Sequence, residues 1–480
     1  MEANIKEVNL TINGVHVKAQ KGTPILEVAR QIGVEIPTLC YIKGLSPYGS
    51  CRICSVEITT ASGRKRIVTS CNYPAEEGLV VETDSERVVK VRRNLLRLLL
   101  ARCPKVTRLK NLASLYGLNE PDLWVENDSE DCILCGLCVR VCNELIRVSA
   151  INFANRGIKR TVTTPYDEFS EDCIGCGACA MICPTGSKKV RTNNYSVVRP
   201  LAAPQKDEKL GAYIDILSAK SSIEGQDGGV VTALLLSGLK NGMFNKAVVV
   251  KRKSGYRAEA VIASTPEEIM EARGTKYFRI KIVPKIKELI SKGERKIAVV
   301  GTPCQVRAAR KIQQILQQEH PDLDITIIGL FCFESFEYEK LKAETARIMG
   351  VNLDDAEKTQ IKRGKFIVSI NGHEYSCKVK ELDHAISNGC PYCSDFPAFF
   401  ADVSVGAVGS PDGYSTVILR TDKGKKLVEN TCLEYGRVNV EEITKLSSFK
   451  KNRAKENFEP LIREIQAVRL KIRGAVGDDA

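Results

Sequence analysis

One cysteine pattern occurs twice in this chain and constrains the fold more than any other feature. Both copies read Cys-x2-Cys-x2-Cys-x3-Cys, with Cys132, Cys135, Cys138 and Cys142 in the first and Cys173, Cys176, Cys179 and Cys183 in the second. Two such runs predict a pair of [4Fe–4S] clusters in which the fourth cysteine of each run binds the other run's cluster. We therefore expect one cluster on Cys132, Cys135, Cys138 and Cys183, and one on Cys173, Cys176, Cys179 and Cys142. The alternatives are a disulfide framework or zinc sites. Zinc sites, however, usually use two separated cysteine pairs.

Length and composition narrow the class of protein. A chain of 480 residues predicts about three domains. The N-terminus leads directly into an alternating strand pattern and does not resemble a signal peptide. No stretch approaches the roughly 18 apolar residues of a membrane span. Nineteen cysteines without an export signal are typical of a reducing compartment, where thiolates bind metal. We expect a soluble, cytoplasmic protein.

The formal net charge is +13, and the densest basic stretch runs from Arg87 to Lys110 around a leucine-rich segment. We interpret this stretch as the solvated face of an amphipathic helix. Docking of an acidic protein or attraction of an anionic coenzyme comes second. No aromatic interleaving or DNA-binding motif accompanies the basic residues, so we expect no nucleic-acid partner.

The first hundred residues predict a β-grasp ferredoxin domain. Apolar residues alternate on both sides of Asn13-Gly14, which indicates a hairpin. Thr23 is a candidate N-cap, with Pro24 in the first turn of a helix that ends near Gly33. A cysteine-bearing loop follows. Four thiolates for a [2Fe–2S] cluster then come from Cys40, Cys51, Cys54 and Cys71.

Local sequence in residues 1–200 resembles the large iron–sulfur subunit of respiratory complex I, iron-only hydrogenases and some formate dehydrogenases. The similar motifs surround Cys40, Cys51-Arg-x-Cys54 and the run that begins at Cys132. Those relatives usually carry a further cluster, bound by one His and three cysteines, after a leucine-rich helix. This chain has only Cys103 at that place. We expect that cluster to be absent and Cys103 to be buried.

Beyond a linker at 201–209, short β-branched runs alternate with helical patterns, which predicts an α/β module with a parallel sheet. Cys304 and Cys332 each follow a predicted strand, and the carboxyl ends of parallel strands share one sheet edge. Together with the loop pair Cys390 and Cys393 they supply four ligands for a third [4Fe–4S] cluster. Structural cysteines or a zinc site are the alternatives. We expect Cys377 and Cys432 to be packing residues.

A glycine-rich turn, Gly225-Gln-Asp-Gly-Gly229, opens a predicted helix. Helix N-termini favour phosphate and other anions, and a Cβ at Gly228 or Gly229 would crowd a bound pyrophosphate. The turn matches neither common nucleotide-binding motif, so a simple connection between elements is an equal alternative.

The turn, Gly301-Thr-Pro-Cys304, Gly329-Leu-Phe-Cys332 and Cys390-x-x-Cys393 together resemble the β subunit of coenzyme F420-reducing hydrogenase and related F420 dehydrogenase subunits. The resemblance implies FAD, one [4Fe–4S] cluster and coenzyme F420 as substrate. Lys276 and Arg273 could then pair with phosphate or carboxylate groups. The implied cofactor-binding residues are Gly225, Gln226, Asp227, Gly228, Gly229, Val230, Thr232, Thr275, Lys276 and Tyr277.

These expectations combine into a mixed α/β and α+β multidomain chain. Its domains are a [2Fe–2S] β-grasp ferredoxin (1–95), a connector with a bacterial-type 2x[4Fe–4S] ferredoxin (96–200), and an α/β flavoprotein module (205–480). We expect an F420 oxidoreductase with no catalytic side chain, because hydride transfer would occur at FAD. A flavin reductase with another substrate and a non-catalytic electron-transfer subunit are the alternatives.

The expected redox partner of this archaeal-type energy metabolism is a carbon monoxide dehydrogenase, formate dehydrogenase, hydrogenase, heterodisulfide reductase or free ferredoxin. We expect the chain to be a subunit of a larger complex.

Overall fold

The structure is a computed structural model that describes residues 7–473, except 168–169, 171–172, 174–176, 188–200, 254 and 318. By its internal contacts the chain forms two compact units. The first unit comprises residues 1–170, 177–190 and 459–480, and the second comprises 171–176 and 191–458. Among the described residues, no helix combines the length and the apolar character needed to cross a membrane.

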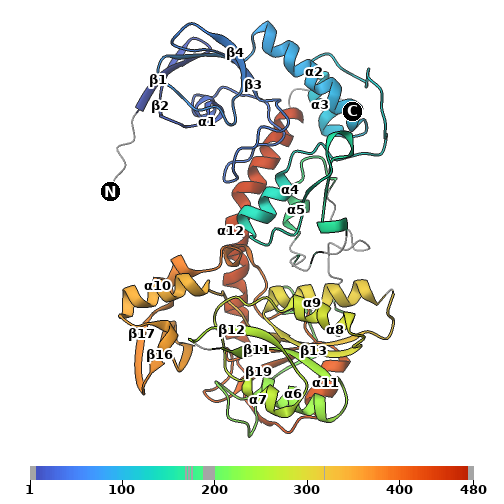
Figure 1. Ribbon diagram of the computed structural model, residues 1–480, viewed down its shortest axis with the longest axis vertical. Coiled ribbons are helices and arrows are strands. Elements are labelled where there is room, and N and C mark those ends of the chain that lie inside the picture. The colour runs from blue at the N-terminus through green and yellow to red at the C-terminus, as the bar shows by residue number, and fades with distance from the viewer. Residues whose placement is uncertain are drawn as a thin grey trace. The chain divides into compact units, whose positions relative to one another are not determined.

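The first unit begins with a five-stranded mixed sheet, drawn in blue in Figure 1, in the order β2-β1-β5-β3-β4. Its strands are β1 (Glu7–Ile12), β2 (Val15–Gln20), β3 (Ser55–Thr59), β4 (Lys65–Thr69) and β5 (Leu79–Glu82). The predicted hairpin is confirmed, because β1 and β2 pair antiparallel around Asn13 and Gly14, which both have positive φ. The short helix α1 (Ile25–Gln31) buries its apolar side in the core of this sheet.

The predicted N-cap of α1 is wrong by one residue. Pro24 occupies the N-cap position, and no side chain caps the helix. The backbone of Thr23 is bonded on both sides, because its N–H donates to the Gln20 carbonyl and its own carbonyl accepts from the N–H of Ala75 at 2.7 Å. This pairing with the neighbouring strand segment outweighs the capping preference of threonine.

The basic stretch forms α2 (Glu86–Arg102) and continues into α3 (Thr107–Ser114). The interpretation as a solvated face holds for Arg87 and Lys90 but is wrong for Arg92, which is 1% exposed. The Arg92 guanidinium donates to the carbonyls of Ser55 and Thr83 and pairs with Asp84 at 2.8 Å. This arginine therefore fixes α2 to the start of β3 and to the segment after β5.

The described residues of the segment with the two cysteine runs form only short elements. Its elements are α4 (Leu137–Arg140), the π-helix η1 (Val141–Leu145), β6 (Asn152–Ala154), the 3₁₀-helix η2 (Gly157–Lys159), β7 (Thr161–Thr163), the 3₁₀-turn η3 (Pro165–Asp167) and α5 (Ala178–Met181). Gly136 and Gly177 precede α4 and α5, and both adopt the left-handed conformation, with φ of 72° and 77°. The glycine repeated in the motif thus reverses the chain between successive cysteines, a backbone conformation that other residues rarely adopt.

The second unit is built on an eight-stranded sheet in the order β12-β11-β13-β14-β18-β19-β10-β20. Only β11, β13, β14 and β18 form a continuous parallel block, so the expected parallel sheet is in fact mixed. The strands are β10 (Asp215–Lys220), β11 (Lys246–Arg252), β12 (Ala258–Ala263), β13 (Lys296–Gly301), β14 (Asp324–Leu330), β18 (Val403–Gly406), β19 (Ser415–Leu419) and β20 (Glu434–Gly436).

Helices cover both faces of this sheet (Figure 1). One face carries α8 (Val283–Ser291) and α9 (Pro303–Leu316). The other carries α6 (Val230–Lys240), α7 (Pro266–Glu271) and α11 (Asp422–Glu429). This arrangement buries strands such as β13 and β14 on both sides, which explains their continuous β-branched sequences.

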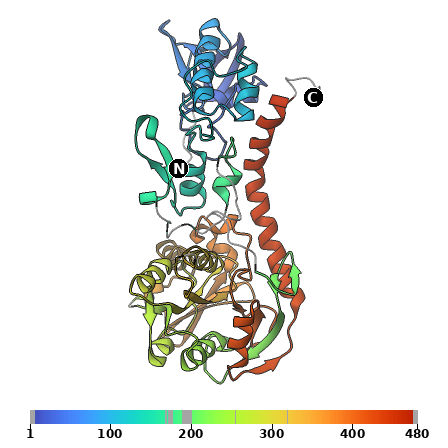
Figure 2. The same ribbon diagram turned by 90° about the vertical axis from the view of Figure 1, so that its right-hand side faces the viewer.

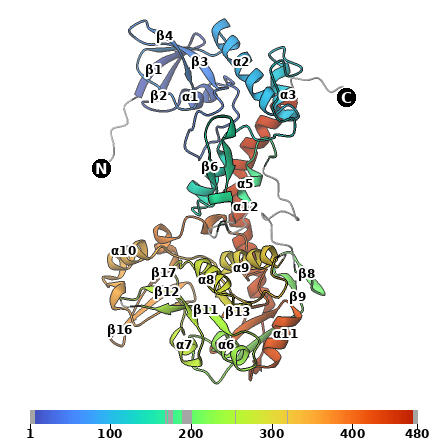
Figure 3. The same cartoon turned by 45° about the vertical axis from the view of Figure 1, so that its right-hand side comes forward.

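Smaller elements complete the second unit. Figure 3 shows α10 (Tyr338–Met349) beside a three-stranded sheet of β15 (Lys358–Lys362), β16 (Lys365–Ile370) and β17 (His373–Lys378). A hairpin of β8 (Gln205–Asp207) and β9 (Gly211–Tyr213) precedes β10. Three short 3₁₀-helices are η4 (Leu353–Asp355), η5 (Val379–Ala385) and η6 (Cys390–Tyr392). The long helix α12 (Val440–Arg473), red in Figure 2, ends the described chain.

Cys377 and Cys432 differ in their surroundings. Cys377 is buried in a core cluster opposite Phe366, as expected for a packing residue. Cys432 is exposed between α11 and β20, so the expectation that it packs is wrong. The turn that follows α11 points its side chain to solvent.

A fully buried arginine joins the hairpin to the main sheet. Arg420 is 0% exposed, and its guanidinium donates to the carbonyls of Leu210, Ala212 and Pro397 and to the Ser404 hydroxyl, all at 2.7–2.9 Å. Removing this donor would leave several buried acceptors without a partner, which costs far more than losing an exposed contact.

Arg420→Met is therefore expected to lower the unfolding free energy by about 3 kcal/mol or more. The exposed Arg437→Met is the control, with an expected change within about 0.5 kcal/mol. Urea denaturation of the anaerobic protein, followed by circular dichroism, measures both. Equal midpoints for the two variants would contradict the role given to Arg420.

Candidate functional site

The cysteines of the N-terminal module form a buried group of four thiols. Cys40, Cys51 and Cys54 lie on the loop between α1 and β3, and Cys71 follows β4. Hydrogen bonds join Cys40 with Cys51 and Cys54 with Cys71, and the two pairs interact electrostatically. The described cysteines of the chain form no disulfide. Four converging soft thiol donors fit an iron–sulfur cluster.

The surroundings of these thiols favour the thiolate form in one member of each pair. The hydrogen bond with Cys51 lowers the pKa of Cys40 to about 6, against the effect of burial, and the Arg140 charge acts in the same direction. The hydrogen bond with Cys71 likewise lowers the pKa of Cys54, although burial opposes it. Thiolates are the form that binds metal.

Arg140 connects this loop with the first cysteine run inside the same unit. In the sequence it lies between Cys138 and Cys142, and its side chain is buried. Its guanidinium donates to the carbonyls of Cys40 and Ser46 at 2.5 Å. The backbone N–H of Ser46 in turn donates to the Glu144 carboxylate at 2.7 Å. These contacts hold the Cys40 loop directly against the α4 and η1 segment.

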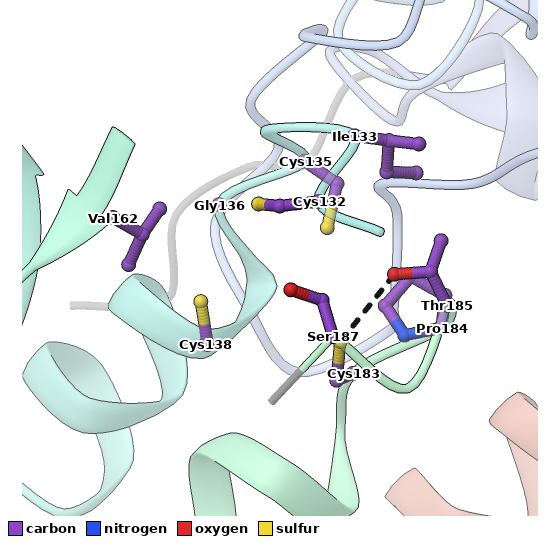
Figure 4. A pocket seen from close by; sticks show the side chains of 10 residues that line it. All are labelled: Cys132, Ile133, Cys135, Gly136, Cys138, Val162, Cys183, Pro184, Thr185 and Ser187. Atoms are coloured by element: carbon purple, nitrogen blue, oxygen red, sulfur yellow. Dashed lines mark hydrogen bonds between the residues drawn. The ribbon is translucent and has the colours of Figure 1, made fainter. Parts of the chain in front are cut away.

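Three cysteines of the first run and the last cysteine of the second run line one small pocket. Figure 4 shows Cys132, Cys135, Cys138 and Cys183 around it. This is the crossed grouping that the sequence predicts for one of the two clusters. The Cys132 carbonyl accepts a hydrogen bond from Arg102 at 2.8 Å, so the end of α2 supports this group.

The second crossed group is described only in part, because Cys176 lies outside the described residues. Cys142 is buried, and its Sγ accepts a hydrogen bond from the N–H of Ala150 at 3.3 Å. Cys179 lies half-buried on α5. Cys173 belongs by its contacts to the second unit, where Lys311 donates to its Sγ at 3.2 Å.

Cys103 is fully buried at the C-cap of α2, as expected. Burial raises the pKa of its thiol to about 12, and the Glu130 carboxylate acts in the same direction. A neutral thiol in this place behaves as a small apolar side chain.

The second unit brings four further cysteines together at the carboxyl ends of β13 and β14. Cys304 is the second residue of α9, Cys332 follows β14, Cys390 begins η6 and Cys393 follows it. Cys332 interacts electrostatically with the other three thiols. Burial raises the pKa of Cys390 to about 12, and it raises the pKa of Cys332 as well. Four thiols from three separate segments of the chain fit a [4Fe–4S] cluster.

One charged residue at this thiol group has no counterpart in the sequence-based expectations. Lys450 of α12 is 2% exposed, and its ammonium donates to the Cys332 carbonyl. Burial alone would lower its pKa, but the neighbouring Cys393, Cys332 and Cys390 thiols and the Asp395 carboxylate raise it. A sequence signal does exist, because Lys450 falls at helical spacing among the buried Ile443, Ser447 and Ala454.

The glycine-rich turn lies between β10 and α6, as predicted, and Gly229 adopts the left-handed conformation at the N-cap. The structure gives its glycines a reason other than room for a pyrophosphate. A Cβ at Gly228 would lie 2.7 Å from the Ala219 carbonyl oxygen, and one at Gly229 would lie 2.1 Å from that of Ile223. The turn itself requires glycine here. The first N–H groups of an α-helix have no partner within the helix and favour anions, so the N-terminus of α6 could hold a phosphate group.

Polar side chains tie this turn to the segment that contains Thr275, Lys276 and Tyr277. The Gln226 side chain donates to the Tyr277 hydroxyl at 3.0 Å and accepts from the Thr275 N–H at 2.9 Å. Burial raises the pKa of Tyr277 to about 12. Burial also raises the pKa of Asp227, which faces Lys358 and Lys362. A carboxylate here repels phosphate but accepts hydrogen bonds from a hydroxyl group.

Lys276 and Arg273 have structural partners in this arrangement. The Lys276 ammonium donates to the carbonyls of Val250, Ala272 and Arg273 at 2.8–2.9 Å, which uses all three of its donors. Burial lowers its pKa to about 8. Arg273 donates to the carbonyls of Met270 and Glu224. Both cations close the C-terminal end of α7, and pairing with phosphate would require them to exchange these partners.

Comparisons with family models match four parts of the chain. Residues 5–86 match a 2Fe-2S iron-sulfur cluster binding domain, and residues 131–187 match a 4Fe-4S dicluster domain. Residues 216–287 and 294–445 match the N-terminal and C-terminal parts of the coenzyme F420 hydrogenase/dehydrogenase beta subunit.

Individual relatives agree with these models. The coenzyme F420 hydrogenase subunit beta of Methanococcus voltae is 38% identical over 47% of this chain and 84% of that subunit. The coenzyme F420-dependent sulfite reductase of Methanocaldococcus jannaschii is 40% identical, over 50% of this chain but only 40% of the reductase.

Among solved structures, a chain of the F420-reducing [NiFe] hydrogenase complex from Methanosarcina barkeri superposes with a TM-score of 0.51. It is 31% identical, over 53% of this chain and 94% of that chain. The present chain therefore belongs to the coenzyme F420 hydrogenase/dehydrogenase beta subunit family and carries iron–sulfur domains of the 2Fe-2S and 4Fe-4S dicluster types.

Proposed function

We propose that this chain is an F420 oxidoreductase that exchanges hydride with coenzyme F420 and passes single electrons to or from a redox partner. The proposal rests on the position of three segments at one edge of the eight-stranded sheet. Strands β10, β13 and β14 run in the same direction, so their carboxyl ends share that edge. The glycine turn, Cys304 and Cys332 follow these three ends. A coenzyme site and an electron-transfer site on one edge are what such a reaction needs.

The coenzyme-binding residues of this proposal surround the glycine turn. The backbone of Gly225–Val230 and the first turn of α6, with Thr232, would hold a phosphate of FAD. Gln226 fixes the distance between that turn and Thr275–Tyr277 through its hydrogen bonds. Bound FAD would accept or release hydride and transfer electrons singly, so the protein has to orient it and exclude water.

The cysteine sets are proposed to hold four clusters. One [2Fe–2S] cluster would use Cys40, Cys51, Cys54 and Cys71. The two dicluster sites would use the crossed groups, and the third [4Fe–4S] cluster would use Cys304, Cys332, Cys390 and Cys393. Arg102, Arg140 and Lys450 each donate to the carbonyl of a proposed ligand, in three of these sets. These cations would reduce the cost of placing anionic clusters in buried surroundings.

The proposed redox partner is a protein that exchanges single electrons. The family includes a subunit of an F420-reducing hydrogenase complex, which supports assembly into a larger complex. Carbon monoxide dehydrogenase, formate dehydrogenase, hydrogenase, heterodisulfide reductase and free ferredoxin remain the candidates. Native purification with mass spectrometry would identify which of them binds.

Reduced F420, mixed anaerobically with the purified protein and an artificial one-electron acceptor, tests the proposed function. We expect the deazaflavin absorbance to return as the acceptor is reduced, and FAD to be released on denaturation. NADPH serves as the comparison substrate. Turnover with NADPH alone would favour a related reductase, and protein that contains no flavin and turns over neither substrate would favour a non-catalytic electron-transfer subunit.

Iron and acid-labile sulfide should approach about fourteen of each per chain, because one [2Fe–2S] and three [4Fe–4S] clusters require that number. Elemental analysis after anaerobic reconstitution measures it. About ten irons would show that one [4Fe–4S] set is empty, and zinc in place of iron would overturn the cluster assignment.

Cys393→Ala is expected to separate the two halves of the reaction. Reduced F420 should still bleach the flavin, because the variant leaves the glycine turn intact, but electrons should not reach the N-terminal clusters. Electron paramagnetic resonance of the [2Fe–2S] signal after mixing measures the transfer. The exposed Cys432→Ala is the matched control and should behave as wild type. Reduction of the [2Fe–2S] cluster at the wild-type rate in Cys393→Ala would refute the proposed route.

A further inference from the structure

Helix α12 packs a buried basic residue against the cysteine site of the second unit. Its buried positions Ile443, Ser447, Lys450 and Ala454 recur at helical spacing, and Lys450 is the one charged member. The match to the family model ends at residue 445, so most of this helix lies beyond it.

The Lys450 ammonium lies beside the four thiols. It donates to the Cys332 carbonyl, and it interacts electrostatically with Cys332, Cys390 and Cys393. The buried Asp395 carboxylate interacts with it electrostatically, but both Asp395 oxygens already accept from the Phe399 N–H, and Asp395 faces Arg307 at 3.9 Å. Within the described residues, no carboxylate oxygen lies within 4.0 Å of Lys450. Its charge is therefore directed mainly to the thiol group.

The same helix holds both cysteine loops in place. Arg453 pairs with Glu334 at 3.0 Å and donates to the carbonyls of Phe333 and Cys390 at 3.5 Å. The Asn457 side chain donates to the Pro391 carbonyl at 2.9 Å. Two ring pairs, Phe333 with Phe449 and Tyr392 with Phe458, add apolar contact. Lys450 thus sits on a rigid support next to the loops of Cys332 and of Cys390–Cys393.

A buried ammonium is costly unless negative charge compensates it. A cluster bound by four thiolates is anionic and gains one more negative charge on reduction. A cation fixed beside it in a buried site therefore stabilises the reduced state more than the oxidised state, because charges interact strongly where water is excluded. The nearby cation raises the reduction potential of the cluster.

We propose that Lys450 sets the reduction potential of the cluster held by Cys304, Cys332, Cys390 and Cys393, and that α12 is the element that positions it. This inference rests on the cluster assigned to these cysteines under the proposed function. It identifies Lys450 as a positioning residue that acts on electron transfer through charge, without touching coenzyme or substrate. It also assigns a role to a helix that extends past the family match.

The experiment is a redox titration of the reconstituted full-length protein, monitored by low-temperature electron paramagnetic resonance, with iron counted in each sample. Lys450→Met and Lys450→Gln remove the charge, and Lys450→Arg keeps it. Lys451→Met removes the same charge one residue further along, where the side chain pairs with Glu208 instead. We expect the two neutral variants to lower the equilibrium constant for reduction of one [4Fe–4S] cluster at least tenfold. This change lowers the reduction potential of that cluster by about 59 mV, because the couple transfers one electron. Lys450→Arg and Lys451→Met should keep the wild-type reduction potential.

Unchanged potentials in both neutral variants with full iron content would overturn the inference. Loss of four irons in Lys450→Gln would also overturn it, because the lysine would then serve cluster assembly. A wild-type protein with about ten irons would refute the cluster and this inference together. A shifted reduction potential in a protein that does not oxidise reduced F420 would support the role proposed for Lys450, and it would refute F420 as the substrate.

Discussion

Cations that donate to backbone carbonyls hold the cysteine loops of this protein in place, and two of the three, Arg140 and Lys450, are buried. Arg140 donates to the Cys40 carbonyl, Arg102 to that of Cys132, and Lys450 to that of Cys332. The loops contain little regular structure, so their carbonyls have few partners within helices or strands. A long basic side chain can reach such a carbonyl from a neighbouring helix and place a positive charge beside the thiols at the same time. One interaction therefore both shapes the loop and places a positive charge where the proposed cluster would be anionic.

The net charge of +13 combines two groups of cations that differ in burial. Exposed lysines and arginines account for much of it, as on any basic protein surface. A separate group of cations is buried, and Arg92, Arg140, Arg420 and Lys450 are each less than 10% exposed. Two of these four contact the carbonyl of a proposed cluster ligand, and the other two fix neighbouring segments. Composition alone cannot separate the two groups, because both add equally to the charge.

Much of the fold could be predicted because local patterns determine it. The Asn13-Gly14 hairpin, the strand–helix alternation after residue 245 and the glycine turn before α6 all depend on short stretches of chain. The crossed grouping of Cys183 with Cys132, Cys135 and Cys138 also follows from spacing, because the ligand pattern of a two-cluster run is itself local. The edge that carries Cys304 and Cys332 was predictable from the direction of parallel strands.

The features that sequence could not predict depend on contacts between distant segments. Pro24 and not Thr23 is the N-cap of α1, and the backbone of Thr23 bonds instead to the distant segment at Ala75. Arg92 is buried because β3 and the end of β5 meet over α2, and its sequence neighbourhood is as basic as that of the exposed Lys90. The glycines of the turn are required by the carbonyls of Ala219 and Ile223, which no nucleotide-binding pattern would indicate. In each case a partner far along the chain, or a backbone close approach, overrides the local preference.

Lys450 shows how a residue outside every motif can become part of a site. It follows Cys332 by 118 residues and lies on a helix whose pattern is charged throughout. Only the sheet topology explains the contact, because β14 ends at the edge against which α12 packs through Phe333, Glu334 and the Cys332 carbonyl. A helix can thus change the electrostatics of a cysteine site while leaving its ligands unchanged. Members of one family with identical cysteines can therefore differ in potential through the charge that such a helix brings to the site.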